Sequence, residues 1–266
     1  MTDSADIVPA TVVALVPRDR VRAMIKAAFP RRKARLILPR SAADFAAVFH
    51  NELVDAAVID VGSGNGDTRA AGALARDFPS VPFFGISGLL GAEGPAVAQC
   101  VSLGFADVLV EGVDESVARE LITRHGFTAR FSDALRIPPP GLGLSSGVQR
   151  KAWEYIVAHA GRRVHTMGLA HRLGVTREHL SRTFAADGAP NLKRVIDLVR
   201  LLAAAELSKN PGYDIRDVAA VLDFASSSHL SSTAQRVVGT KPASLSRLRS
   251  VDLILRFTRG HGRSRA

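Results

Sequence analysis

The sequence predicts two domains: an α/β domain with a flavodoxin-like, five-stranded parallel sheet, and an all-α domain with two helix-turn-helix units. Three observations support this prediction. Short β-branched runs alternate with helical stretches over residues 1–135, which is the pattern of a parallel sheet covered on both faces. A linker rich in proline, glycine and serine follows at 136–147. Beyond the linker, a helix-turn-helix pattern occurs twice.

The first domain, residues 1–135, alternates strands and helices five times. Each strand is a short apolar run, as expected where both faces of a parallel sheet are buried. Ser41 is the expected cap of the second helix, because its hydroxyl can accept a hydrogen bond from a free amide of the first turn. The predicted strands are 11–16, 34–39, 55–61, 81–87 and 106–110, and the predicted helices are 19–29, 41–51, 68–78, 92–102 and 114–125.

The first helix-turn-helix unit spans residues 166–188. Gly174 can end its first helix, since glycine adopts the left-handed conformation easily, and Thr176 can cap the second. Such a second helix can lie in a DNA major groove with its outward side chains against the bases. The outward residues are Arg177, Glu178, Ser181 and Arg182.

These side chains differ in how well they discriminate among bases. Arg182 can donate two hydrogen bonds to guanine, and Glu178 can accept one from cytosine. We assign Arg177 to a phosphate contact. The first unit is therefore expected to read the DNA sequence.

The second unit, residues 218–239, repeats the first. Matching residues stand 49 to 51 positions apart, a drift that indicates one structural unit used twice. Its helix is expected to be capped by Ser226 or Ser227. Serines discriminate weakly among bases, so this unit is expected mainly to grip the DNA backbone. The residues that match the first recognition face are Ser227, Ser228, Ser231 and Ser232.

Two further helices complete the second domain. Residues 148–160 are predicted to form its first helix, with Trp153 facing the core. Residues 191–209 are predicted to form a long helix that spans about 28 Å and holds the two recognition helices about one DNA turn apart. Residues 251–266 form a basic tail, and we expect 256–266 to be disordered.

Three motifs follow one another in this domain: LAHRLGVTREHLSRTF, then RLLAAAELSKNPGYDIRDVAAVLDFASSSHLSS, then RVVGTKPASL. On these motifs, residues 148–250 resemble the DNA-binding domain of the AraC/XylS-type transcription regulators. The resemblance implies two helix-turn-helix units joined by a long helix, and a sequence-specific regulator. One departure is Asp223, which stands before Phe224 where the family has a glycine.

The first domain carries a second resemblance. The third strand, DAAVID, ends at Asp60, Ser87 ends the fourth, and GFADVLVEGVD follows the fourth helix. On these residues, the domain resembles the receiver domain of response regulators, which implies Asp60 as the phosphoacceptor. Arg18, however, stands where receivers have acidic residues, and Glu111 where they have lysine.

Phosphoryl transfer needs cations beside the transferred group, and the two exchanged charges oppose it. We therefore interpret the first domain as a degenerate receiver, or pseudo-receiver, that serves as an input or dimerisation domain. The alternative is a phosphorylation-dependent response regulator that uses Asp60.

The positive charge lies in the second half of the chain. Residues 1–135 hold 14 Lys/Arg and 16 Asp/Glu, whereas residues 136–266 hold 21 and 9, a net charge of +12. Such a charge suits the neutralisation of DNA phosphates. Double-stranded DNA is the expected partner, and a homodimer through the first domain and contact with RNA polymerase are the other partner predictions.

Several other classes of protein are disfavoured. The single cysteine, Cys100, allows no internal disulfide and is expected to be a buried thiol. The start MTDSADIVPA does not fit a signal peptide, and no apolar run reaches about 18 residues, so a cytoplasmic protein without membrane contact is expected. The glycine loop 62–66 does not fit a nucleotide-binding fingerprint. We expect no enzyme, no cofactor and no metal site.

Overall fold

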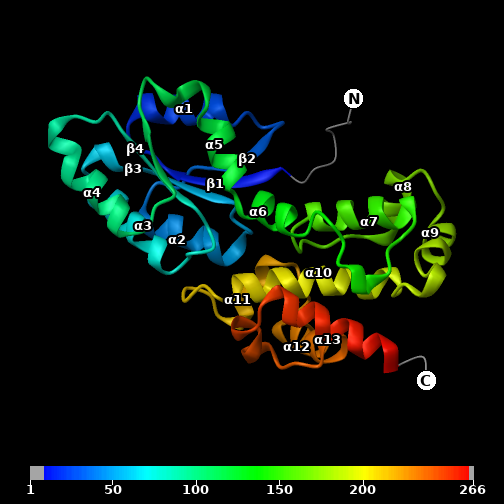
Figure 1. The fold of residues 1–266 in the computed structure, drawn as a ribbon. Helices are drawn as coiled ribbons and strands as arrows, with labels where there is room; N and C mark the ends of the chain where they lie inside the picture. The colour runs from blue at the N-terminus through cyan, green and yellow to red at the C-terminus, as the bar shows by residue number, and fades with distance from the viewer. Residues whose placement is uncertain (1–8, 264–266) are drawn as a thin grey trace. The chain divides into compact units, whose positions relative to one another are not determined.

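The computed structural model describes residues 9–263, which divide into two compact units. The sheet unit consists of residues 9–130 together with Asn210–Tyr213, and the helical unit consists of Phe131–Lys209 and residues 214–263 (Figure 1). Residues 1–8, on which the signal-peptide prediction rests, lie outside the described residues, as does the end of the basic tail at 264–266. None of the described helices is long and apolar enough to cross a membrane.

The sheet unit is built on five parallel strands in the order β2-β1-β3-β4-β5. This is the flavodoxin-like, doubly wound order, and it confirms the predicted fold class. All five predicted strands are present; β1 keeps its predicted length but begins one residue earlier, and the other four are shorter than predicted by one or two residues. They are β1 (Ala10–Leu15), β2 (Ala34–Ile37), β3 (Ala56–Asp60), β4 (Phe83–Ser87) and β5 (Asp107–Val110).

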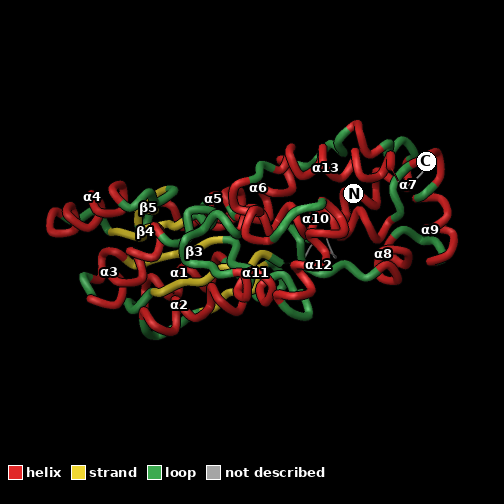
Figure 2. Tube along the Cα trace, turned by 90° about the horizontal axis from the view of Figure 1, so that it is seen from below, coloured by secondary structure: helices red, strands yellow, loops and turns green. Residues whose placement is uncertain are grey.

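Helices cover both faces of the sheet: α1 and α5 lie on one face, and α2, α3 and α4 on the other (Figures 1 and 2). Because successive strand residues point to opposite faces, Val12 packs with the α1 side while a ring cluster of Phe45, Phe49 and Phe83 fills the other side. The bounds are α1 (Asp19–Ala28), α2 (Ala42–Asn51), α3 (Gly66–Ala73), α4 (Gly94–Ser102) and α5 (Ala118–His125).

The local signals in this unit act as predicted. The Ser41 hydroxyl accepts a hydrogen bond from the Asp44 amide at 3.1 Å and begins α2. Cys100 is buried on α4. One helix was missed: α6 (Phe127–Ala134), which follows α5 and begins in the sheet unit but continues into the helical unit. Phe127, Phe131 and Leu135, four residues apart and all buried, give that helix its apolar stripe.

The helical unit is organised around α10, most of whose residues are buried. This helix contacts α7, α11, α12 and α13, and α7 buries Trp153 as predicted. The bounds are α7 (Gly147–Ala158), α8 (Thr166–Arg172), α9 (Arg177–Phe184), α10 (Leu192–Leu207), α11 (Ile215–Val221), α12 (Ser227–Val238) and α13 (Ser250–Arg263).

Two predictions about this unit are wrong in part. The long helix α10 has 16 residues, about 24 Å, because Ser208 and the residues after it leave the helix. The tail is not disordered up to residue 263, since α13 runs through it. Leu253 and Phe257 are fully buried, and Arg194 lies over the Phe257 ring, 5.2 Å from its centre. An apolar stripe with a four-residue period therefore anchors a segment whose composition is basic.

Candidate nucleic-acid interface and aspartate site

The turn between α8 and α9 is closed by backbone hydrogen bonds. Gly174 has φ +67°, and the Val175 amide donates to the Ala170 carbonyl at 3.0 Å. The Thr176 hydroxyl then accepts from the His179 amide at 3.1 Å and caps α9. These bonds satisfy free backbone groups at the ends of both helices, so α9 is held at a fixed angle to α8.

The turn between α11 and α12 repeats this arrangement. The Phe224 amide donates to the Ala219 carbonyl at 2.8 Å, and the Ser226 hydroxyl accepts from the His229 amide at 3.0 Å. Asp223 takes the place of Gly174 and has φ +54°. The sequence repeat is therefore a structural repeat, and Ser226 is the cap of α12.

We expect Asp223→Gly to raise the free energy of unfolding of the helical unit by about 1 kcal/mol. A left-handed backbone costs a residue with a Cβ about 1–2 kcal/mol, which the extra freedom of glycine in the unfolded chain offsets only in part. Denaturant unfolding followed by Trp153 fluorescence would measure it. The matched change Gly174→Ala, where a Cβ meets open space, should lower the stability by a similar amount. An unchanged stability in Asp223→Gly would show that Asp223 carries no strain.

The four predicted residues of the first recognition helix lie on α9 and are all exposed. Within the described part of the chain, the side chains of Arg177, Glu178 and Arg182 form no ion pair or hydrogen bond. Leu180 and Phe184, on the opposite side of α9, are fully buried. The helix thus buries one face and leaves its charged face available to a ligand.

The four serines of the second unit lie on α12, where Ser228 and Ser232 are exposed and Ser227 and Ser231 are half-buried. The Ser231 hydroxyl donates to the Ser227 carbonyl at 2.8 Å, and the Ser232 hydroxyl donates to the His229 carbonyl at 3.1 Å. Both hydroxyl protons are used within the helix. What these two side chains can offer a ligand is mainly an acceptor oxygen.

Two charged residues of α10, which the sequence analysis missed, hold the second unit in place. Arg200, only 7% exposed, donates from Nη2 to the carbonyls of Leu222 at 2.8 Å and Asp223 at 3.0 Å. Its guanidinium lies 3.8 Å from the centre of the Phe224 ring. Burial lowers the pKa of Arg200. The sequence signal that could have identified Arg200 is a charged residue among the apolar residues of the long helix.

The second of these residues, Asp197, accepts from Arg236 of α12 at 2.9 Å. Asp197 is nearly buried, whereas the Arg236 side chain is more than half exposed. The ion pair fastens α12 directly to α10. Together with the Arg200 contacts, it fixes both helices of the second unit on one support.

Asp60 ends β3 and is completely buried. The Arg18 guanidinium contacts both of its oxygens, with Nε 2.9 Å from Oδ1 and 3.0 Å from Oδ2, and Nη2 2.6 Å from Oδ1. The Arg18 amide adds a bond of 3.3 Å to Oδ2. The hydrogen bond to Asp60 is the main cause that raises the pKa of Arg18. A built-in cation therefore neutralises this carboxylate.

The residues around the Arg18–Asp60 ion pair form further charged contacts. Glu111 accepts from Arg18 Nη1 at 2.9 Å and from Arg20 Nε at 3.1 Å. Ser87 donates to Glu93, which also accepts from the Gly88 amide at 2.8 Å. Among the side chains that the structure describes, no three His, Cys, Asp or Glu are grouped to hold a metal ion. Arg20 and Glu93 were not predicted as site residues, because no sequence motif marks them.

Comparisons with known proteins cover the helical unit best. A family model described as a helix-turn-helix domain matches residues 169–247. None of the curated proteins compared with the chain matches it. The crystal structures of full-length FixJ from B. japonicum align at 12% identity over 85% of this chain and 96% of that chain, with a TM-score of 0.38. A TM-score this low does not establish a shared fold, and the fold of the sheet unit is defined by its strand order.

The family match and the duplicated turn define the class. The helical unit contains a helix-turn-helix domain over residues 169–247, of the kind found in DNA-binding transcription regulators. The chain also carries a flavodoxin-like sheet unit.

Proposed function

We propose that the chain is a sequence-specific transcription regulator of AraC type that binds double-stranded DNA through α9 and α12. The observation that carries the proposal is the repeated turn, with the same hydrogen bonds at Gly174 and Asp223. The net charge of +12 over residues 136–266 supports phosphate contact.

The two recognition helices differ in what they offer. Arg182 and Glu178 on α9 are exposed and without partners among the described residues, so they can contact base edges. The Ser231 and Ser232 hydroxyls on α12 already donate to their own helix. We therefore propose that α9 reads the sequence and that α12 mainly holds the backbone, aided by its N-terminus.

Arg182→Ala should weaken binding to the preferred site by about 1–3 kcal/mol and relax the base preference at one position. Sites selected from a random DNA pool by the wild-type and variant chains would measure this. The matched control is the double change Ser228→Ala and Ser231→Ala on α12, which should lower affinity while leaving the preferred sequence nearly unchanged. Uniform weakening over all sequences in Arg182→Ala would mean that Arg182 contacts only phosphate.

For the sheet unit, we propose a pseudo-receiver that acts as an input or dimerisation domain. Arg18 supports this, because its guanidinium occupies both oxygens of Asp60. With both of its oxygens bound to Arg18, the Asp60 carboxylate is not free to bind Mg²⁺. Glu111, in place of the receiver lysine, is already paired with Arg18 and Arg20.

A second candidate is a phosphorylation-dependent regulator, which the position of Asp60 at the carboxyl end of β3 favours. Incubation with acetyl phosphate and Mg²⁺ separates the two candidates. We expect no phosphate adduct by intact mass spectrometry, because Arg18 blocks the carboxylate and Glu111 stands in place of the lysine that would stabilise the transferred group. A stoichiometric adduct that disappears in Asp60→Ala would establish the second candidate instead.

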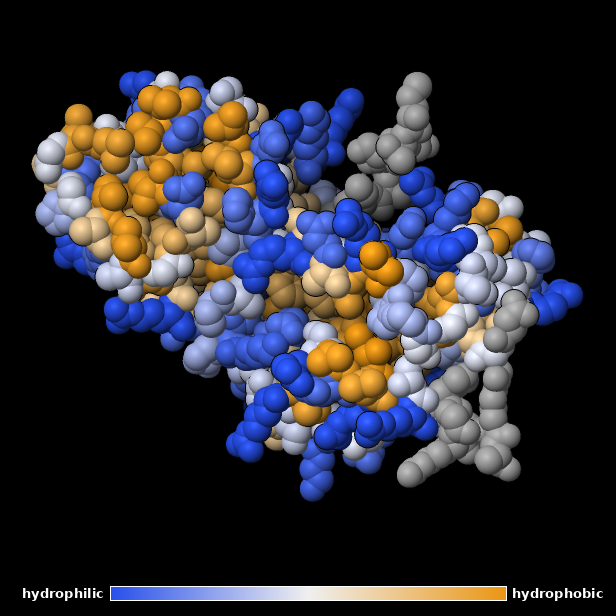
Figure 3. All heavy atoms as spheres, in the orientation of Figure 1, coloured by the Kyte–Doolittle hydropathy of each residue, from blue (hydrophilic) through white to orange (hydrophobic). Residues whose placement is uncertain are grey.

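The same unit offers a surface for self-association. Val101, Val113 and Val117 are large apolar residues on α4 and the segment before α5, and all three are exposed. Figure 3 shows apolar residues gathered over this part of the sheet unit. Exposed apolar patches of this kind mark interaction sites, which supports a homodimer through the sheet unit.

A further inference from the structure

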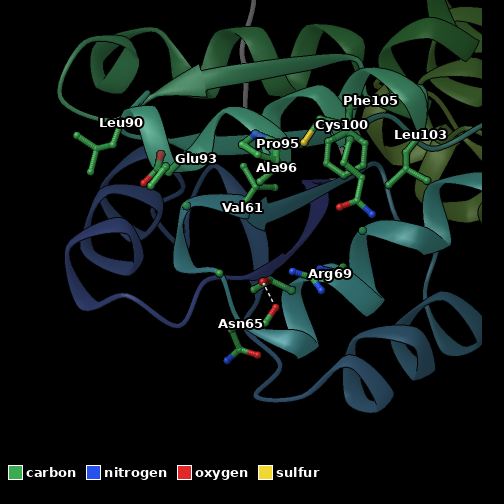
Figure 4. A pocket seen from close by; sticks show the side chains of 16 residues that line it. Val61, Asn65, Arg69, Leu90, Glu93, Pro95, Ala96, Cys100, Leu103 and Phe105 are labelled. Carbon is green, nitrogen blue, oxygen red and sulfur yellow. Dashed lines mark hydrogen bonds between the residues drawn. The ribbon is translucent and has the colours of Figure 1, made fainter.

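A cavity of about 500 Å³ lies in the sheet unit between α3, α4 and the loop after β3 (Figure 4). It is open because the residues that face it are small: Gly72 on α3, Ala96 on α4, and Gly62 and Gly64 in the loop. A Cβ on Gly72 would already reach the Phe105 ring at 3.4 Å. The volume falls within the range of small-molecule sites, about 300–1,000 Å³.

The wall of this cavity is mainly apolar. Val61, Pro95, Leu103 and Phe105 line it, and so does Cys100. Burial raises the pKa of the Cys100 thiol to about 11, so the sulfur stays protonated at neutral pH and offers no nucleophile. A ligand that fills this space therefore needs an apolar body.

Two charged residues of opposite sign line the cavity. Glu93, 9% exposed, is held by Ser87 and the Gly88 amide. It closes the side near Gly62, where a Cβ would lie 2.7 Å from Glu93 Oε1. Arg69 comes from α3 and is exposed. Among the described residues, Arg69 forms no ion pair and no side-chain hydrogen bond, so its guanidinium is available.

We propose that this cavity binds a small amphipathic carboxylic acid, with its apolar body beside Phe105 and its carboxylate on Arg69. Glu93 sets the orientation, because a carboxylate placed near it would meet like charge. Arg69 favours an acid over other polar groups, since a guanidinium pairs with a carboxylate through two parallel hydrogen bonds. The site lies wholly within the sheet unit and does not depend on DNA binding.

Titration of the full chain with 3-phenylpropionate and, separately, with 3-phenylpropionamide tests the proposal. The two probes share an apolar body and differ in charge. Two-dimensional NMR should place the shifted amide signals at Arg69, Ala96 and Phe105. The acid should bind about fivefold more tightly than the amide, as expected for one partly exposed ion pair.

Three variants separate the contributions. Arg69→Gln should reduce the affinity for the acid to that for the amide, whereas Arg119→Gln, at an exposed arginine of α5, should change neither. Ala96→Phe fills the cavity and should weaken both probes about tenfold or more. Equal binding of acid and amide to the wild-type chain would overturn the carboxylate assignment. Absence of binding, or shifts confined to other residues, would overturn the site, whether or not Ala96→Phe folds.

Discussion

Replacing Arg18 by methionine should lower the free energy of unfolding of the sheet unit by about 3 kcal/mol, because a buried carboxylate would lose its cation. Asp60 is completely buried, and the Arg18 guanidinium contacts both of its oxygens. Methionine keeps the apolar stem but cannot neutralise the charge. Glu111 would still be paired with Arg20, so Asp60 would be the carboxylate left without a cation. Native-state hydrogen exchange at the amides of β3 would measure it.

A second substitution, Asp60→Asn, tests the ion pair further, because its effect on the stability of the sheet unit should have opposite signs in the wild-type and Arg18→Met chains. In a cluster of acidic residues built for a cation, removal of one carboxylate relieves repulsion between like charges. Here Asp60→Asn alone should destabilise the sheet unit, since Asp60 is the main partner of Arg18. In the Arg18→Met chain, Asp60→Asn should instead recover part of the loss, because it removes the unpaired charge.

A matched control for Arg18→Met is available at Arg40, which is exposed and close in sequence. Arg40→Met should change the stability by less than about 0.5 kcal/mol, as is usual at the surface. A loss below about 1 kcal/mol in Arg18→Met, or no coupling between Arg18 and Asp60 in the double variant, would contradict the role given to this ion pair.

The fold was largely predictable because local patterns agree with the global arrangement. Each β-branched run became a strand, and Ser41 and Thr176 cap the helices that follow them. The α6 helix and the end of α13 were not predicted. Each has apolar residues four apart, Phe127 and Phe131 in α6 and Leu253 and Phe257 in α13. No element is predicted over residues 126–135, and the basic composition of 256–266 indicates disorder.

The aspartate site was only half predictable. The exchange of charges at Arg18 and Glu111 was visible in the sequence, but the contact of Arg18 with both oxygens of Asp60 was not predicted. The partners Arg20 and Glu93 were not predicted either, because their contacts depend on how separate loops come together. Asp223 illustrates the same limit: the sequence marked it as a departure, but only the backbone shows that it adopts the left-handed conformation.

Arg200→Met should lower the free energy of unfolding of the helical unit by about 2–3 kcal/mol and weaken DNA binding about tenfold. Two effects oppose each other. Removal of the buried charge eliminates the free-energy cost of desolvating it. The same desolvation lowers the pKa of Arg200. Against this, the carbonyls of Leu222 and Asp223 lose their donor, at about 1–3 kcal/mol each where they stay buried. The contact with the Phe224 ring, worth up to about 2 kcal/mol, is lost as well.

The loss of these contacts should outweigh the removed desolvation cost, because methionine fills the volume but donates no hydrogen bond to the end of α11. DNA affinity should fall with stability, since that turn sets the angle of α12. Trp153, the only tryptophan, is buried in this unit, so its fluorescence reports unfolding there. Lys193→Met, at an exposed position of the same helix, should leave both properties unchanged. A destabilised Arg200→Met chain that bound DNA normally would show that Arg200 supports the fold without positioning α12.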